Sequence, residues 1–142
     1  MDVSGKVFFI TGGAQGLGKA FAEALLGRGS KVCLGDIDET TGVATSEDFK
    51  KRFGEENVRF IAVDVTDDGQ FEAAFKEAVS TFGRVDVMVN NAGILTEPEW
   101  EKTIQINFLV IYQALATANR AGRAEQNSGD HLQYGQSLMH IA

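Results

Sequence analysis

A glycine-rich turn near the N-terminus constrains the fold of this chain more than any other feature of its sequence. The apolar run 6–11 leads into the turn, Thr11-Gly12-Gly13-Ala14-Gln15-Gly16-Leu17-Gly18, and apolar residues then recur at helical spacing from 17 to 25. A short apolar run that ends at glycines is typical of a strand buried on both faces of a parallel sheet. The order of strand, glycine turn and helix therefore predicts the start of a βαβ unit that can bind a dinucleotide.

The residues of the turn are candidates for binding a diphosphate. Gly12 and Gly16 let the backbone turn sharply and approach a phosphate without a Cβ in the way, and Gly18 lets the helix pack closely on the strand. Gln15 and Leu17 lie where the helix begins, and its first N–H groups attract an anion. Glycine spacing alone would also fit an ordinary tight turn, but the flanking strand and helix favour a cofactor site.

The rest of the chain repeats the alternation of strand and helix. Further strands are predicted at 31–36, 58–64 and 85–89, and the helix after the third strand is expected to be capped by Thr66. A last helix is predicted from about 99 toward 118. Four strands that alternate with four helices predict an α/β fold, a doubly wound, Rossmann-like parallel sheet, incomplete and with the strand order 3-2-1-4.

The C-terminal part of the chain does not continue this pattern. We expect one NAD-binding domain over 1–118 and an irregular tail over 119–142, because no apolar period persists in the tail. Without a fifth strand, the strand at 85–89 would be an exposed apolar edge. Ile104, Phe108 and Ile111 would then be exposed apolar residues, and the chain is expected to self-associate or to be marginally stable.

An acid follows the second predicted strand. Asp36 lies eighteen positions after Gly18, where its carboxylate can accept hydrogen bonds from the ribose hydroxyls of NAD. A 2′-phosphate at ~4 Å would be repelled by roughly 4 kcal/mol per pair of unit charges before screening. The neighbouring Ile37 supplies no positive charge, so the sequence predicts NAD rather than NADP. Asp36 could instead cap the next helix, a role that Asp38 can also fill.

Two further strand ends carry candidate cofactor-binding residues. Asp64-Val65 follows the third strand, where the carboxylate could accept a hydrogen bond from the adenine amino group, or could simply cap a helix. The segment Asn90-Asn91-Ala92-Gly93 follows the fourth strand. Its amides and small residues suit a loop that passes beside a cofactor, although alone it would be an ordinary turn.

Composition excludes several classes of function. The net charge of −7 argues against nucleic acid or an acidic membrane surface as partner, because both require basic patches. The single Cys33 excludes an internal disulfide and a cysteine-built zinc site, and its apolar surroundings favour a buried thiol. No metal site is expected. No apolar run approaches the ~20 residues that a membrane span requires, and the apolar run 7–10 is too short for a signal peptide, so a cytoplasmic location is expected. The negative charge favours a small molecule as partner.

Together these motifs resemble the short-chain dehydrogenase/reductase family. The resemblance rests on Thr11-Gly12-x-x-x-Gly16-x-Gly18, Asp36, Asp64-Val65, Asn90-Asn91-Ala92-Gly93 and Ile106-Asn107, and it covers residues 1 to about 109. It implies oxidation of a secondary alcohol on a lipid-like substrate, with hydride transfer to NAD, usually by a homodimer. Asn107 would then bend its helix and hold a water of the proton relay, although a merely tolerated helical Asn is the alternative.

The resemblance also implies catalytic residues that these 142 residues do not supply. The family uses a Ser and a Tyr-x-x-x-Lys pair, in which the Lys lowers the pKa of the Tyr so that it acts as a general base. Here Ala116 lies four positions after Tyr112, Leu138 lies four after Tyr134, and no Lys follows Lys102. We therefore expect no complete catalytic set and no activity of this chain alone.

The abrupt end of the resemblance indicates a changed reading frame or an alternative exon. Codons for 133–137 exist that read Asn-Met-Ala-Ser in a shifted frame, a sequence similar to the family's strand that ends in the catalytic serine. Three hypotheses follow: a dehydrogenase by descent that is inactive in this form, a non-catalytic module that binds NAD or a partner, and a product without a stable fold.

Overall fold

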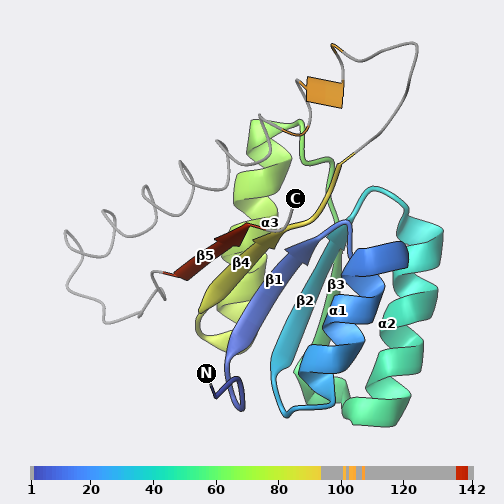
Figure 1. Cartoon of the computed structure of the whole chain (residues 1–142), viewed down its shortest axis with the longest axis vertical. Coiled ribbons are helices and arrows are strands. Elements are labelled where there is room, and N and C mark those ends of the chain that lie inside the picture. The colour runs from blue at the N-terminus through green and yellow to red at the C-terminus, as the bar shows by residue number, and fades with distance from the viewer. Residues whose placement is uncertain (1, 94–100, 102, 105–106, 108–136, 141–142) are drawn as a thin grey trace.

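The protein has a parallel sheet with helices on both faces (Figure 1). The computed structural model describes residues 2–93, 101, 103–104, 107 and 137–140. The strands are β1 Val7–Thr11, β2 Lys31–Asp36, β3 Val58–Ala62, β4 Val87–Asn90 and β5 Ser137–His140. The helices that it bounds are α1 Gly16–Leu26, α2 Glu39–Phe53, α3 Asp68–Phe82 and the short 3₁₀ helix η1 Glu55–Asn57. The strand order is β3-β2-β1-β4-β5, which confirms the predicted α/β class and the order 3-2-1-4.

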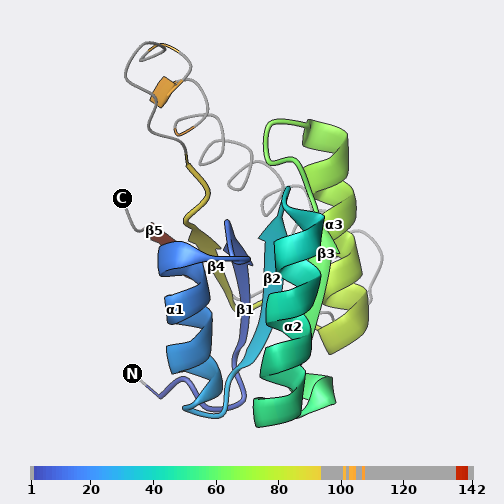
Figure 2. The same ribbon diagram turned by 90° about the vertical axis from the view of Figure 1, so that its right-hand side faces the viewer.

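The core consists of two apolar clusters, one on each face of the sheet. Successive side chains of a strand point to opposite faces. Phe8 and Ile10 of β1 therefore join one cluster with residues of α1 and α2, whereas Phe9 joins the other with residues of α3. Figure 2 shows α1 and α2 on one side of the sheet and α3 on the other. All five residues of β1 are buried, as predicted for a strand covered on both faces of a parallel sheet.

The helix ends show which acids act as caps. Asp38 caps α2 because its Oδ1 accepts from the Thr41 N–H at 3.0 Å, and hydrogen bonds from Thr41 lower the pKa of the Asp38 carboxyl. The prediction that Thr66 caps α3 is wrong. Asp67 is the cap and accepts from the Gln70 N–H at 2.9 Å, because the Thr66 hydroxyl is already donated to Asp64.

Two predicted strands have shifted ends. β3 stops at Ala62 rather than at 64, because the segment after it turns back through the bonds between Thr66 and Asp64. β4 begins at Val87 rather than at 85 and continues to Asn90. The carboxylate of Asp86, just before β4, accepts from the Val7 N–H at 2.9 Å and so joins the amino ends of two strands.

The fifth strand corrects two predictions. No element was expected in 119–142, yet β5 pairs in parallel with β4, with Val87 opposite Ser137 and Asn90 opposite His140. β4 is therefore not an edge strand, and the prediction of an exposed edge at 85–89 is wrong. Backbone groups make the bonds of a parallel ladder. A four-residue strand is also too short to show an apolar period, which explains why the tail gave no signal.

The predicted last helix falls mostly outside the described residues. Residues 101, 103, 104 and 107 are helical. Ile104 is 59% exposed, although the absence of a fifth strand, from which its exposure was expected, is not found. Phe108 and Ile111 lie outside the described residues. Among the helices that the structure describes, none is long and apolar enough to cross a membrane.

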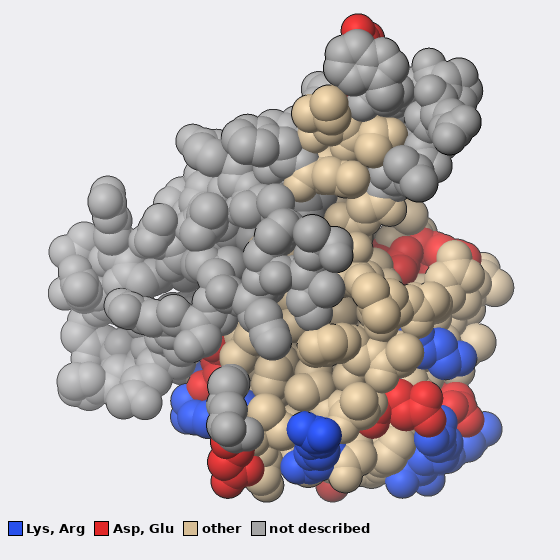
Figure 3. Space-filling view, in the orientation of Figure 1, with Lys and Arg blue, Asp and Glu red and all other residues tan. Residues whose placement is uncertain are grey.

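Charged side chains of both signs lie on the surface of the described part of the chain (Figure 3). On the face shown in Figure 3, basic and acidic side chains are interspersed. Arg52 of α2, for example, pairs with both Glu23 and Asp48. Cys33 is a free thiol that is fully buried, as expected, and burial raises the pKa of this thiol well above its usual range. It therefore stays protonated and serves as a core residue.

Candidate cofactor-binding site

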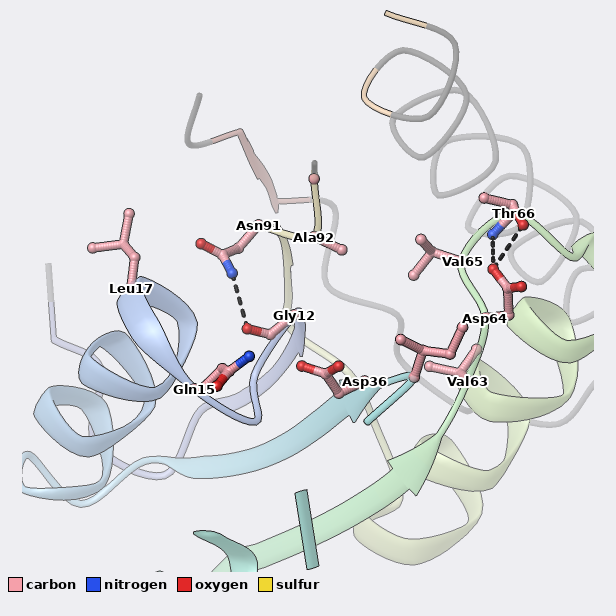
Figure 4. Close-up of a pocket in the computed structure, with 12 residues that line it drawn as sticks. Gly12, Gln15, Leu17, Asp36, Val63, Asp64, Val65, Thr66, Asn91 and Ala92 are labelled. Carbon is pink, nitrogen blue, oxygen red and sulfur yellow. Dashed lines mark hydrogen bonds between the residues drawn. The ribbon is translucent and has the colours of Figure 1, made fainter. Parts of the chain in front are cut away.

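A pocket of about 460 Å³ lies at the carboxyl ends of the strands, where an open parallel sheet usually binds its ligand. It is shown in Figure 4 and is lined by Gly12, Gln15, Leu17, Asp36, Ile37, Val63, Asp64, Val65, Thr66, Asn91, Ala92 and Gly93. The structure thus brings together ten of the twelve candidate cofactor-binding residues. Gly16 and Gly18 do not line the pocket but shape the turn beside it.

The glycine turn forms one wall of the pocket, and glycine is needed at its positions for different physical reasons. Gly12 and Gly16 have φ of 65° and 58°, a left-handed conformation that favours glycine. Gly18 has no such conformation, but a Cβ there would lie 2.2 Å from the carbonyl oxygen of Gly12. The close packing of α1 on the end of β1 that was expected for Gly18 is therefore present.

The start of α1 offers donors toward an anion. Gln15 is the N-cap residue, and its side chain makes no capping hydrogen bond. The first N–H groups of a helix have no partner within the helix, and an anion is a favourable partner for them. This end of α1 can therefore receive a phosphate group.

Asp36 stands at the end of β2, facing the turn (Figure 4). Its Oδ2 accepts from the Ala14 N–H at 3.0 Å, and its Oδ1 accepts from the Asp38 N–H at 3.1 Å. Because Asp38 caps α2, Asp36 is not the helix cap that the sequence left open as an alternative. A carboxylate has about four acceptor positions, so Asp36 retains capacity for ligand hydroxyls. Among the lining residues that the structure describes, none is Arg or Lys.

The segment after β4 is bonded directly to the glycine turn. Asn91 donates its Nδ2 to the carbonyl oxygens of Thr11 and Gly12, both at 3.1 Å. The Thr11 hydroxyl oxygen accepts from the N–H groups of Asn91 and Ala92, also both at 3.1 Å. Sequence reasoning assigned Thr11 no such role, although its place just before the glycines was a usable signal.

The third strand end closes the pocket on the other side. Asp64 Oδ1 accepts from the N–H of Thr66 at 2.9 Å and from its hydroxyl at 2.7 Å, whereas Asp67 caps the helix (Figure 4). Val65 is half-buried, while Ile37 is 71% exposed. Val63 and Thr66 also line the pocket but were not among the candidates. The pocket therefore has polar groups beside apolar side chains, a combination that suits a nucleotide.

Asn107 lies against this site. A Cβ at Gly93 would come within 2.8 Å of Asn107 Oδ1, so the two residues are close neighbours. The glycine thus makes room for the amide of a residue fourteen positions later. The tyrosines considered as catalytic candidates, Tyr112 and Tyr134, lie outside the described residues. No group of three or more His, Cys, Asp or Glu in the described part of the chain could hold a metal ion.

Comparison with known proteins identifies the class that this fold and site define. The family model for short chain dehydrogenases matches residues 6–130. The match extends past 118, the expected end of the domain. The chain therefore belongs to the short-chain dehydrogenase family.

Individual relatives narrow the similarity. The chain is 46% identical over 111 residues to human 15-hydroxyprostaglandin dehydrogenase [NAD(+)], covering 78% of this chain and 42% of that protein. It is 37% identical over 136 residues to trans-4-hydroxycyclohexanecarboxylate dehydrogenase of Sinomonas cyclohexanicum, covering 84% of this chain and 52% of that one.

A solved relative shares the fold. The structure is similar to a short-chain dehydrogenase/reductase from Burkholderia phymatum in complex with NAD, with a TM-score of 0.75, 27% identity and coverage of 84% of this chain and 45% of that one. The chain thus spans about half the length of the relatives that it matches.

Proposed function

We propose that this chain is an NAD-binding unit of an oxidoreductase that oxidises a secondary alcohol by hydride transfer to NAD. One observation carries the proposal: the Asp36 carboxylate faces the glycine turn in a pocket whose described lining has no Arg or Lys. A diphosphate nucleotide with free ribose hydroxyls suits such a pocket better than one with a 2′-phosphate. The similarity to 15-hydroxyprostaglandin dehydrogenase supports a lipid-like hydroxy substrate for the whole protein.

Each wall of the pocket has a proposed part in holding the cofactor. The backbone of Gly12 to Gly18, with Gln15 and Leu17, would hold the diphosphate, and Asp36 would accept from the adenosine ribose. The adenine would be contacted by Asp64, Val65 and Ile37. The loop of Asn91, Ala92 and Gly93 would pass beside the cofactor. NAD when bound supplies the hydride acceptor. Asn107, which lies beside Gly93, would hold a water of the proton relay.

Cofactor preference tests this proposal. The unmodified chain should bind NAD⁺ about ten- to a hundredfold more tightly than NADP⁺, because the Asp36 charge repels the phosphate even after screening. Asp36→Asn should narrow that preference by weakening NAD⁺ binding and strengthening NADP⁺ binding. Isothermal titration calorimetry gives both dissociation constants.

The choice of asparagine matters, because Asp36 also accepts from Ala14. Asp36→Asn removes the charge but keeps one acceptor oxygen, which can serve the Ala14 N–H while the Asp38 N–H loses its acceptor. Asp36→Ala removes the charge and both acceptors. Comparison of the two variants separates electrostatic discrimination from support of the turn. Equal dissociation constants for NAD⁺ and NADP⁺ in the unmodified chain would contradict the assignment.

We also propose that residues 1–142 alone do not oxidise alcohols. The family's Tyr-x-x-x-Lys pair is not present in the sequence, so no general base of that kind could take the hydroxyl proton. With NAD⁺ and a 15-hydroxyprostaglandin, absorbance of NADH should not rise above the rate without protein. A rate that survives repurification would instead reveal another base.

The alternative of a non-catalytic NAD-binding module uses the same pocket. Cofactor binding without turnover agrees with both readings, and only pull-down of a specific partner would favour the module. The cytoplasmic location and the homodimer remain parts of the proposal that rest on composition and on the family resemblance.

A further inference from the structure

A threonine of α2 contacts the glycine turn from outside the pocket. Thr45 is 3% exposed and does not line the pocket. Its Oγ1 donates to the carbonyl oxygen of Ala14 at 2.7 Å, across a separation of 31 residues. Ala14 itself is completely buried. This bond therefore joins the second helix to the middle of the turn.

The two polar groups of Ala14 are held by different elements. Its N–H donates to Asp36 Oδ2 at 3.0 Å, and its carbonyl accepts from Thr45. The preceding N–H, that of Gly13, donates to the carbonyl oxygen of Gly35 at 3.2 Å. Gly12 and Gln15, on either side of this pair, both line the pocket. The position of Ala14 thus sets how the turn presents its backbone to a ligand.

Thr45 stands on a firmly packed part of α2. The buried residues of this helix are Gly42, Thr45, Ser46 and Phe49. A Cβ at Gly42 would lie 2.0 Å from the ring of Phe60, so the helix lies close against β3. Phe49 is completely buried. The position of the Thr45 hydroxyl is therefore fixed by the packing of α2 against the sheet.

We propose that Thr45 is a positioning residue for the cofactor-binding turn and acts through the Ala14 carbonyl. The inference rests on the proposed function, because it concerns the binding of the same dinucleotide. Thr45 makes no hydrogen bond to Asp36, the residue proposed to distinguish NAD from NADP, and its replacement leaves the Asp36 charge in place. Loss of the Thr45 hydroxyl should therefore weaken the binding of NAD⁺ and NADP⁺ by the same factor. Loss of the Asp36 charge should instead change the ratio of the two dissociation constants.

The test compares Thr45→Val with Ser46→Ala. Valine keeps the size and branching of threonine but leaves the buried Ala14 carbonyl without this donor. Ser46 is the next residue, is also buried, and its Oγ has no hydrogen-bond partner in the described structure. Ser46→Ala thus removes a hydroxyl from the same helix face without breaking a bond to the turn, and Thr45→Ser restores the hydroxyl.

Thr45→Val should raise the dissociation constants of NAD⁺ and NADP⁺ equally, by about three- to tenfold, the effect expected for one net hydrogen bond. The dissociation constants of Ser46→Ala and Thr45→Ser should stay within about twofold of those of the unmodified chain, below that range. Hydrogen exchange of the amides in 12–18 should accelerate in Thr45→Val only. A general loss of stability would accelerate exchange throughout the protein, so acceleration confined to 12–18 would report on the turn itself.

The outcomes separate this inference from the function on which it rests. If the unmodified chain binds neither cofactor, the proposed function fails and the inference fails with it. If it binds NAD⁺ and Thr45→Val binds equally well, or changes the NAD⁺ to NADP⁺ ratio, the inference alone is overturned. If Thr45→Val does not fold, Thr45→Ala removes the same hydroxyl. Failure of both to fold, with Thr45→Ser and Ser46→Ala folded, would assign Thr45 to the fold instead.

Discussion

Gly18→Ala is expected to weaken NAD⁺ binding strongly. The added Cβ would lie 2.2 Å from the carbonyl oxygen of Gly12 and 2.6 Å from Asn91 Nδ2. The first contact is with backbone, so relief requires α1 or the turn itself to move. Overpacking of this kind costs about 1–3 kcal/mol, and here the displaced atoms form the wall of the pocket. If this whole cost falls on the bound state, calorimetric titration should show a loss of affinity of about five- to 150-fold, a factor of ten being about 1.4 kcal/mol.

Gly5→Ala is the control for a general effect of replacing glycine. Gly5 lies before β1, has a φ of 71° and would have nothing within 4 Å of an added Cβ. Its replacement should cost about 1–2 kcal/mol of stability from the left-handed conformation alone. Its affinity for NAD⁺ should not change. Binding by Gly18→Ala equal to that of Gly5→Ala would contradict the close contact between α1 and the turn.

The order of the first four strands could be predicted because their apolar runs are continuous. Val32, Cys33 and Leu34 are all completely buried in β2, and such strands show up in sequence as short apolar runs. The right-handed crossover rule then leaves few arrangements for alternating strands and helices. β5 could not be predicted in this way, because four residues within a polar segment carry no comparable run.

Much of the candidate site could also be anticipated, since its residues follow the ends of strands. Asp36, Asp64 and Asn91 each stand at such an end, and parallel strands bring their carboxyl ends to one edge. Contacts made by side chains to distant backbone groups left no local signal. The bond from Thr45 to Ala14 spans 31 residues, and that from Asn91 to Thr11 spans 80. The contact between Thr45 and the glycine turn could therefore be identified only from the structure.

The opposite end of the sheet carries the residue whose loss should affect stability most while sparing the site. Asp86 is 5% exposed, and its Oδ2 accepts from the buried Val7 N–H at 2.9 Å. Its Oδ1 pairs with Arg84, whose side chain is 39% exposed. One carboxylate thus joins the amino ends of β1 and β4, while the pocket lies at their carboxyl ends. Stability and cofactor affinity should therefore be separable here.

Asp86→Ala should lower the free energy of unfolding by about 2–4 kcal/mol, because Val7 and Arg84 both lose their acceptor in a largely buried setting. Asp86→Asn keeps an acceptor for Val7 and should cost less. Glu77→Gln, which breaks the exposed pair with Arg59, should cost under about 1 kcal/mol. Urea unfolding followed by circular dichroism measures these differences, and the affinity of folded Asp86→Ala for NAD⁺ should match that of the unmodified chain. An Asp86→Ala variant as stable as Glu77→Gln would show that the carboxylate does not hold the two strands together.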